Sequence, residues 1–354
     1  MAKERIHDMP ITNGSYQVQG IVNGVEKQNF YTEKKTKTNK NFRMINFGVE
    51  YDNHKSIYMT LNGMPKDKVY FSKKGENGKN TTVSVTWKDR MNGPEGFRML
   101  NSVNCGLTKT IGKDGKEIND KKVLIDYDAC EYIANNLTDD SSVFVRGNIE
   151  FNSYSKNGEV TRTTKFIPTQ VSLCKDVDFN DENRKLVNDF TQTIVFMGID
   201  QEKENDKPTG RYVVEAKIVN YNSIESAEFI IEDAKLAKRF KTGLKPYWSI
   251  TTSGHINVVN SVETVETVEN EDEWGEPNRM ERTNAPTKRE FVITGAKGNT
   301  IDKESYTEKK INDAIRKMNA AQTAEENFSG KVAASDDTDV DWGDTDSTDE
   351  ETGW

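Results

Sequence analysis

Basic and aromatic side chains recur together in one stretch near the start of this sequence. From Lys27 to Lys122 there are 20 Lys or Arg residues against 10 Asp or Glu residues. Aromatic residues stand beside the bases at four places, namely Phe30-Tyr31, Tyr70-Phe71, Trp87 and Phe97. Single-stranded nucleic acid requires both kinds of side chain, because cations bind its phosphates and aromatic faces stack on its unpaired bases. The pattern therefore predicts a surface that binds single-stranded nucleic acid.

The candidate contacts are bases and aromatic rings of these runs and of neighbouring β-prone segments. They are Phe30, Tyr31, Lys34, Lys35, Lys37, Lys40, Arg43, Tyr58, Tyr70, Phe71, Lys73, Lys74, Trp87, Lys88, Arg90, Arg98, Arg146, Tyr154 and Arg162. For any one of them an alternative stays open, in which the lysine is a solvated loop tip or the ring belongs to the core. The chain after residue 180 is less basic and contains an acidic loop at Glu263–Glu281. We expect that part to extend the groove, to dimerise or to dock a partner.

The formal net charge of -9 comes from the last twenty residues. Ser335–Trp354 holds nine acids and no base, so the 49 Lys and Arg residues of the chain face 58 − 9 = 49 acids in the rest of it. Two tryptophans lie among these acids, which a purely solubilising tail does not need. The candidate partner-binding residues are Asp339, Asp341, Trp342, Asp349, Glu350, Glu351 and Trp354. Such a tail either recruits other proteins or competes for a basic groove, and a plain solubilising role is the alternative.

Several classes of protein are disfavoured by what the sequence lacks. No window approaches 18 apolar residues, and the N-terminus has no apolar signal segment. The three cysteines Cys105, Cys130 and Cys174 are far apart, which fits free thiols in a reducing cytosol. With three histidines and no phosphate-binding glycine loop, we expect no enzyme, no cofactor and no metal. A metal-dependent nuclease is a minor alternative, because no acidic cluster has the spacing that two-metal chemistry needs.

Short β-prone runs, separated by Gly, Asn and Lys clusters, make up most of the chain. The first series is Tyr16–Val22, Phe42–Tyr51, Ser56–Leu61, Lys68–Phe71, Thr82–Trp87, Val143–Tyr154 and Thr161–Leu173, with an amphipathic helix at Asp126–Leu137. The second series is Phe190–Gly198, Tyr212–Tyr221, Ala227–Ile231, Tyr247–Val259 and Lys288–Thr294, with a helix around Ala234–Phe240. A capping-box pattern at Ser305 and Glu308 predicts a last helix that runs to about Ala324.

The two series repeat one order: three strands, a helix and two strands. Phe42–Tyr51 aligns with Tyr212–Tyr221 at an offset of 170, the helices and the following strands align at 107, and the last strands align near 125. The first series carries a basic insert at about 64–125. This order is that of the OB-fold, a five-stranded Greek-key barrel. The sequence thus predicts a mainly β protein of two tandem OB-fold-like barrels, each with one short helix, plus a C-terminal helix and a disordered acidic tail. The expected domains are residues 1–180, 181–326 and 327–354.

The whole arrangement resembles the single-stranded DNA-binding proteins of bacterial and bacteriophage replication. The resemblance rests on the strand order, on the basic and aromatic loops, and on the acidic tail with Trp342 and a terminal Trp354. In that family an OB-fold body binds the strand and an acidic tail ending in an aromatic residue recruits other proteins. The bacterial members end in Ile-Pro-Phe, whereas this chain ends Glu351-Thr-Gly-Trp354, and they usually carry one barrel per chain.

The resemblance implies a non-catalytic, sequence-independent single-stranded DNA-binding protein of DNA replication, recombination or repair. We expect it to be phage-encoded, to work in the cytoplasm of a bacterial host, and to recruit replication or recombination proteins through its tail. Homo-oligomer formation is left open. The alternative is a phage protein–protein interaction module, such as an anti-defence factor or a recombination mediator, that uses OB-like barrels to hold other proteins.

Overall fold

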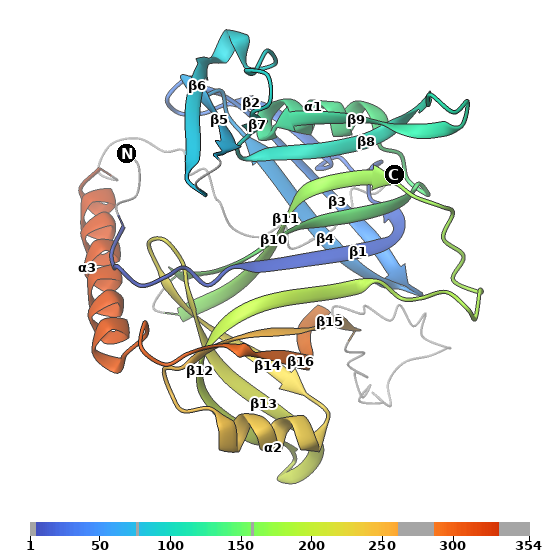
Figure 1. Ribbon diagram of the computed structural model, residues 1–354. Coiled ribbons are helices and arrows are strands. Elements are labelled where there is room, and N and C mark those ends of the chain that lie inside the picture. Colours follow the sequence, from blue (N-terminus) through green and yellow to red (C-terminus); the bar gives the residue numbers. More distant parts are fainter. Residues whose placement is uncertain (1–4, 76–77, 157–158, 261–286, 333–354) are drawn as a thin grey trace, which may run out of the picture.

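The structure is a computed structural model that describes residues 5–75, 78–156, 159–260 and 287–332 (Figure 1). It is mainly β, as the sequence predicts, with three α-helices in this part of the chain. The tail residues named above and the acidic loop at Glu263–Glu281 lie outside the described residues. None of the described helices is both long and apolar enough to cross a membrane.

Barrel 1 contains five strands of the first predicted series, namely Tyr16–Val22, Phe42–Tyr51, Ser56–Leu61, Val143–Tyr154 and Thr161–Leu173. Strand β1 pairs antiparallel with β3 and β10, β3 pairs with β4, and β10 pairs with β11. Strand β4 lies along β11, short β2 lies on the other edge of β3, and α1 contacts both β3 and β4. The elements are β1 (Gly14–Asn23), β2 (Tyr31–Lys35), β3 (Asn41–Asp52), β4 (Lys55–Gly63), α1 (Asp126–Asn136), β10 (Ser142–Lys156) and β11 (Glu159–Leu173).

Barrel 2 closes completely through hydrogen-bonded strands. The circuit runs β12–β13–β14–β16–β15 and back to β12, and only the β14–β16 pair is parallel. This connectivity, with a helix between the third and fourth strands, is that of an OB-fold. The elements are β12 (Asn188–Glu204), β13 (Lys207–Val219), β14 (Ile224–Ile231), α2 (Ala234–Gly243), β15 (Ser249–Asn260) and β16 (Thr287–Asp302). The predicted fold class is confirmed.

Equivalent residues occupy equivalent places in the two barrels. Strand β10 has a register shift at Gly147, and β15 has one at Gly254, 107 residues later. At both glycines a Cβ would meet a main-chain carbonyl oxygen of the last strand at about the same distance, 2.0 Å at Gly147 and 1.8 Å at Gly254. The bare backbone is therefore required at both positions.

The two barrels are joined by their first strands, which run side by side in Figure 1. Strands β1 and β12 pair antiparallel with Tyr16 directly opposite Phe190, while Gly14 faces Gln192 and Val18 faces Asn188. Tyr16 and Phe190 are equivalent residues, because each pairs with the glycine at its own barrel's register shift. The pairing is thus symmetric about these two residues, and the barrels are related by a local two-fold axis. One apolar cluster runs through both.

The insert between β4 and α1 forms two structures. Strands β5, β6 and β7 make a small separate sheet in the order β6–β5–β7, with a 3₁₀ turn, η1, after β6. Strands β8 and β9 extend the main sheet through a parallel pair between β8 and β11. The bounds are β5 (Lys68–Lys74), β6 (Asn80–Thr86), η1 (Trp87–Asp89), β7 (Arg98–Met99), β8 (Ser102–Ile111) and β9 (Glu117–Ile125). The sequence did not predict β8 and β9 as strands.

The C-terminal helix α3 (Glu308–Val332) packs on barrel 2 and is longer than predicted. Ile311 and Ala314 are buried with Met9, Val219 and Ile224 in a cluster of their own. The Tyr306 hydroxyl, just before the helix, donates to the carbonyl oxygen of Pro10 at 3.0 Å. The helix therefore fixes the N-terminal segment to barrel 2.

Candidate nucleic-acid interface

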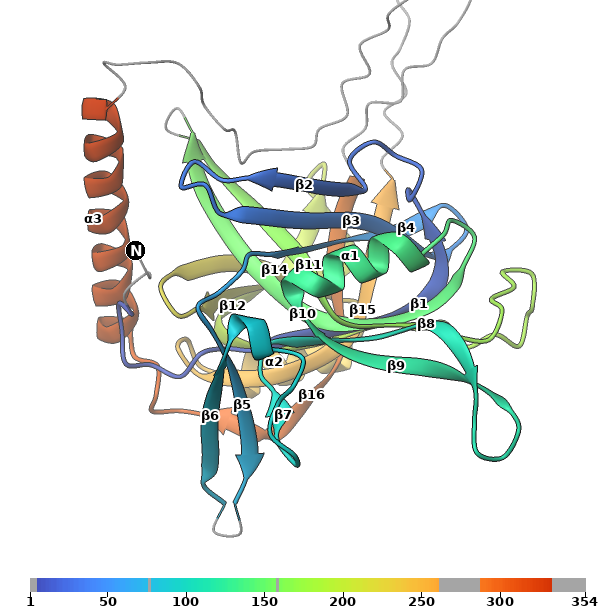
Figure 2. The ribbon, with the colours of Figure 1, turned by 90° about the horizontal axis from the view of Figure 1, so that it is seen from above.

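The small sheet of the insert has one buried face and one open face. Along β5 the side chains alternate, so Val69 and Phe71 are buried while Lys68, Tyr70 and Lys74 are exposed. Val69 and Phe71 pack with Met99, Ile125 and Tyr127 in a small core beneath the sheet. Figure 2 shows the β5–β6 hairpin projecting away from the rest of barrel 1.

The open face, which we call the insert face, surrounds a tyrosine with cations and hydroxyl groups. Tyr70 is 52% exposed and stands opposite Ser84, and Ser72 stands opposite both Thr82 and Arg98. Directly opposite residues of an antiparallel pair share one face. Strands β5, β6 and β7 carry four cations and no carboxylate. The insert face consists of Lys68, Tyr70, Ser72, Lys74, Thr82, Ser84 and Arg98.

Two other predicted contacts fasten the insert to the helix of barrel 1. The Arg90 guanidinium donates from Nε and Nη2 to the two carboxylate oxygens of Asp128 at 2.6 and 3.0 Å, and these hydrogen bonds raise the pKa of Arg90. The same guanidinium lies 4.5 Å from the Trp87 ring centroid. Trp87 in turn meets the Tyr127 ring edge-on at 5.9 Å. Arg90 and Trp87 are therefore engaged within the protein.

Arg43 is engaged in a similar way on β3. Its guanidinium lies 3.2 Å from a Glu33 carboxylate oxygen and 2.9 Å from one of Glu131, and 4.1 Å from the Tyr127 ring centroid. Tyr31 donates its hydroxyl to Glu33 at 2.9 Å, and burial raises the pKa of the tyrosine. Because the Arg43 charge is paired with Glu33 and Glu131, this guanidinium is engaged within the protein.

Tyr58 is a second exposed ring, on the β3–β4 surface that OB-folds use for oligonucleotides. It is 47% exposed and lies opposite Gly48, where a Cβ would come within 3.0 Å of the ring. The Lys27 ammonium lies 6.0 Å from the ring centroid. Tyr58 therefore presents a solvent-exposed ring that lies over Gly48 and next to the Lys27 ammonium.

The remaining predicted contacts are spread over the surface of barrel 1 and its insert. Lys34, Lys35, Lys37 and Lys40 are exposed on β2 and the turn to β3, and Lys88 is exposed on η1. Lys73 lies on the other side of β5 from Tyr70, with its ammonium 5.8 Å from the Phe97 ring centroid. Arg146 is exposed on β10, and Tyr154 and Arg162 lie on the β10–β11 hairpin. Phe30 and Phe71 are core side chains, 7% and 4% exposed, and present no ring to solvent.

The structure thus gathers Tyr70, Lys74 and Arg98 on one face and leaves the other candidates in separate places. Sequence reasoning missed Lys68, Ser72, Thr82 and Ser84. The signal that marks Lys68 is the alternation of β5, because residues 68, 70, 72 and 74 share a face once Tyr70 is known to point outward.

Groups for covalent or metal chemistry are sparse in the part of the chain that the structure describes. No group of three or more His, Cys, Asp or Glu side chains there is arranged to hold a metal ion. Burial raises the pKa of the Cys105 and Cys130 thiols to about 12, so neither is a reactive thiolate at neutral pH.

A family model described as YorF matches residues 13–330, so the chain belongs to the YorF family. The comparison with curated proteins finds no match. Among solved structures, the chain is similar to the wild-type single-stranded DNA binding protein from Thermus aquaticus, with 10% identity and a TM-score of 0.36 over 80% of this chain and 91% of that one. It is also similar to a deletion mutant of the same protein, with 9% identity and a TM-score of 0.37 over 80% and 93% of the two chains. Values this low assign no activity to the chain.

Proposed function

We propose that this member of the YorF family binds single-stranded DNA without sequence preference and catalyses no reaction. The observation that carries the proposal is the insert face, where Tyr70 lies among Lys68, Lys74 and Arg98 on strands that have no carboxylate. The fold contributes a rigid support, because the buried side of the same sheet is fixed to α1 through Trp87 and Arg90.

The chemistry of the insert face suits an unpaired strand. A tyrosine ring stacks on any base for about 1–3 kcal/mol, because every base has a π-face. Lysine and arginine cations replace condensed counterions on the phosphates, which makes binding fall with salt. The hydroxyls of Thr82 and Ser84 donate to phosphate oxygens and do not identify a base.

The direct test is fluorescence anisotropy with labelled oligo-dT and with a duplex of the same length, at two salt concentrations. Tyr70→Ala should weaken oligo-dT binding about tenfold, and Tyr70→Phe should restore it, because the ring and not the hydroxyl stacks on the base. Tyr221→Ala is the matched control, since Tyr221 is equally exposed at 50% but lies on barrel 2. The proposal would be contradicted if Tyr70→Ala and Tyr221→Ala lowered the affinity for oligo-dT equally, or if that affinity did not change with salt concentration.

The same samples test the non-catalytic part. Labelled oligo-dT incubated with the protein and Mg²⁺ or Mn²⁺ should remain full-length. If the oligo-dT is shortened, and if the cleaving activity copurifies with the protein, the protein is a nuclease. The alternative of a protein–protein module predicts partners that survive nuclease treatment in a pull-down, together with no salt-dependent binding of oligo-dT.

We also propose that the protein acts in DNA replication, recombination or repair. We further propose that the tail from Asp339 to Trp354, which lies outside the described residues, recruits other proteins.

A further inference from the structure

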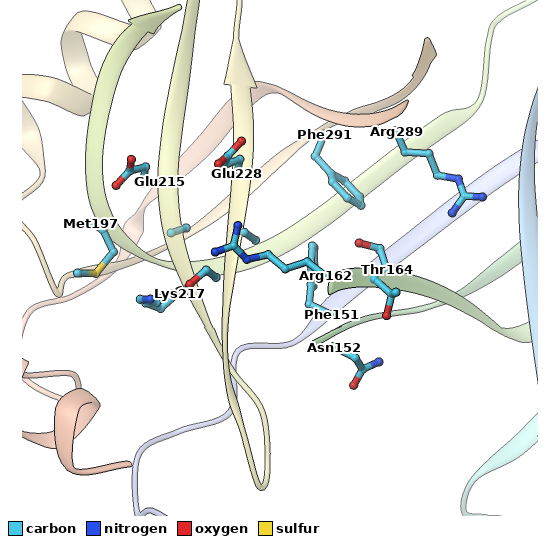
Figure 3. A pocket seen from close by; sticks show the side chains of 14 residues that line it. Phe151, Asn152, Arg162, Thr164, Met197, Glu215, Lys217, Glu228, Arg289 and Phe291 are labelled. Carbon is cyan, nitrogen blue, oxygen red and sulfur yellow. Dashed lines mark hydrogen bonds between the residues drawn. The ribbon is translucent and has the colours of Figure 1, made fainter. Parts of the chain in front are cut away.

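A cleft of about 530 Å³ lies between the two barrels (Figure 3). It is lined by β10 and β11 of barrel 1 and by β12, β13, β14 and β16 of barrel 2. The buried rings of Phe151 and Phe291, with centroids 5.4 Å apart, form part of its wall. Its volume is within the range of sites that take small molecules or single residues of a polymer.

Three cations line this cleft, and each comes from a different strand. They are Arg162 on β11, Lys217 on β13 and Arg289 on β16. Neither guanidinium has a hydrogen bond or an ion pair with any residue that the structure describes. The Lys217 ammonium donates to the Ser226 hydroxyl at 2.7 Å, and burial together with the nearby charge of Arg162 lowers its pKa. The cleft therefore holds two guanidinium groups that form no ion pair with the described residues.

Two carboxylates give the cleft a polarity. Glu215 and Glu228 stand directly opposite each other on β13 and β14. Figure 3 shows Arg289 on the far side of the cleft from Glu215, with Phe291 between them. Neither carboxylate forms an ion pair among the described residues. The Glu215 end of the cleft thus holds acids together with Lys217 and Arg162, whereas Arg289 lies apart from the acids.

Barrel 2 also contacts the surface of barrel 1 that carries the exposed Tyr58 ring. Tyr58 lies on the β3–β4 surface, and β15 of barrel 2 packs against β4 there, with the Val258 amide donating to the Tyr51 hydroxyl at 3.1 Å. A strand stacked on Tyr58 would therefore lie close to barrel 2.

We infer that the bound strand crosses the cleft between the barrels and that Arg289, Arg162 and Lys217 contact its backbone phosphates, so that barrel 2 takes part in binding. This inference rests on the proposed function and adds a second contact region to the insert face.

The test is the anisotropy titration of the full chain with oligo-dT of on the order of 30 nucleotides, because each OB-fold covers about 4–16 nucleotides. Arg289→Gln and Arg162→Gln should each weaken binding about three- to tenfold and lower the slope of log affinity against log salt by about 0.7. Glu228→Gln should tighten binding by a similar factor, because it removes repulsion. Lys238→Gln is the matched control, with the same charge change on the exposed face of α2.

The outcomes separate the two ideas. If oligo-dT binds and Tyr70→Ala weakens it, but both arginine variants match the Lys238→Gln control, the cleft inference is overturned and the proposed function stands. If the unmodified chain does not bind oligo-dT, the proposed function fails and the inference fails with it. Thermal melting of the arginine variants should match the unmodified chain, because neither guanidinium has a partner in the described fold, so weaker binding cannot be assigned to unfolding.

Discussion

Phe166 in barrel 1 and Phe291 in barrel 2 occupy the same place and make the same contact. Each ring meets the aromatic ring of its barrel's first strand edge-on, Tyr16 at 5.0 Å and 82° and Phe190 at 5.1 Å and 81°. The arginines Arg90 of barrel 1 and Arg211 of barrel 2, by contrast, make different contacts. Arg90 fastens the insert of barrel 1, whereas Arg211 lies among acids of barrel 2, 2.6 Å from Glu290.

This difference shows where the two halves of the chain have diverged. The cores and the glycine positions agree, while the basic insert between β4 and α1 exists only in barrel 1. In barrel 2 the chain passes from β14 to α2 through Glu232 and Asp233, and Asp233 caps the helix by accepting from the Lys235 and Leu236 amides. The basic insert thus lies outside a core that the two barrels share.

The largest expected effect tests the equivalence of the cores. Gly147→Ala and Gly254→Ala should each lower the free energy of unfolding by about 2–3 kcal/mol, because the new Cβ meets a main-chain oxygen that cannot move alone. Chemical denaturation measures both. Gly198→Ala on β12, where no atom lies within 4 Å of the new Cβ, should cost far less. A large loss at only one of the two sites would break the equivalence.

The next largest effect tests the attachment of the insert to α1 through Arg90 and Asp128, which barrel 2 does not have in the described residues. Asp128→Ala should cost about 2 kcal/mol, because it removes two hydrogen bonds to a partly buried guanidinium. We expect the loss to appear first as faster amide hydrogen exchange in β5, β6 and β7, with barrel 2 unchanged. Asp120→Ala removes an exposed pair with Lys122 at 3.9 Å and serves as the control. Uniform acceleration over both barrels would argue against a separately attached insert.

A smaller effect tests the centre of the two-fold relation. The Tyr16 hydroxyl is buried without a hydrogen-bond partner among the described residues, whereas the equivalent Phe190 has no hydroxyl. Tyr16→Phe should therefore raise the free energy of unfolding by about 1 kcal/mol, and Phe190→Tyr should lower it by about as much. Destabilisation by Tyr16→Phe would show that the hydroxyl has a partner.

The smallest effect concerns the tail. Deletion of Ser335–Trp354 removes nine acids and should leave oligo-dT affinity equal or slightly higher, because it removes charge that competes with phosphate. Weaker binding after the deletion would contradict a competing tail. A scrambled tail of the same composition separates charge from the contribution of Trp342 and Trp354.

The order of strands and helices was predictable because their periodicity is local. The equivalence of Phe166 and Phe291 was predictable for the same reason, since their strands repeat a pattern of apolar residues. The pairing of β1 with β12 was not, because it joins two edge strands that are far apart in the chain. Strands β8 and β9 were missed because Lys, Thr and Gly interrupt their apolar pattern.

The candidate site was only partly predictable. Tyr70 and Phe71 are adjacent aromatic residues in the same sequence context. The alternation of a strand places their side chains on opposite faces of the sheet, but it does not show which face is exposed to solvent. Arg90 looked like Arg98 in the sequence, but its partner Asp128 lies 38 residues away. Arg289 of barrel 2 and Arg162 of barrel 1 are far apart in the sequence, so their meeting in one cleft depends on how the two barrels pack.

The symmetric pairing of Tyr16 with Phe190 has a consequence for how the molecule could change. In a dimer of identical chains, an insertion in one subunit appears in the other, and both copies must be tolerated. Here the two halves are covalently linked, so each half keeps its partner at any dilution. The same linkage lets one half acquire a charged appendage while its counterpart keeps the unmodified barrel.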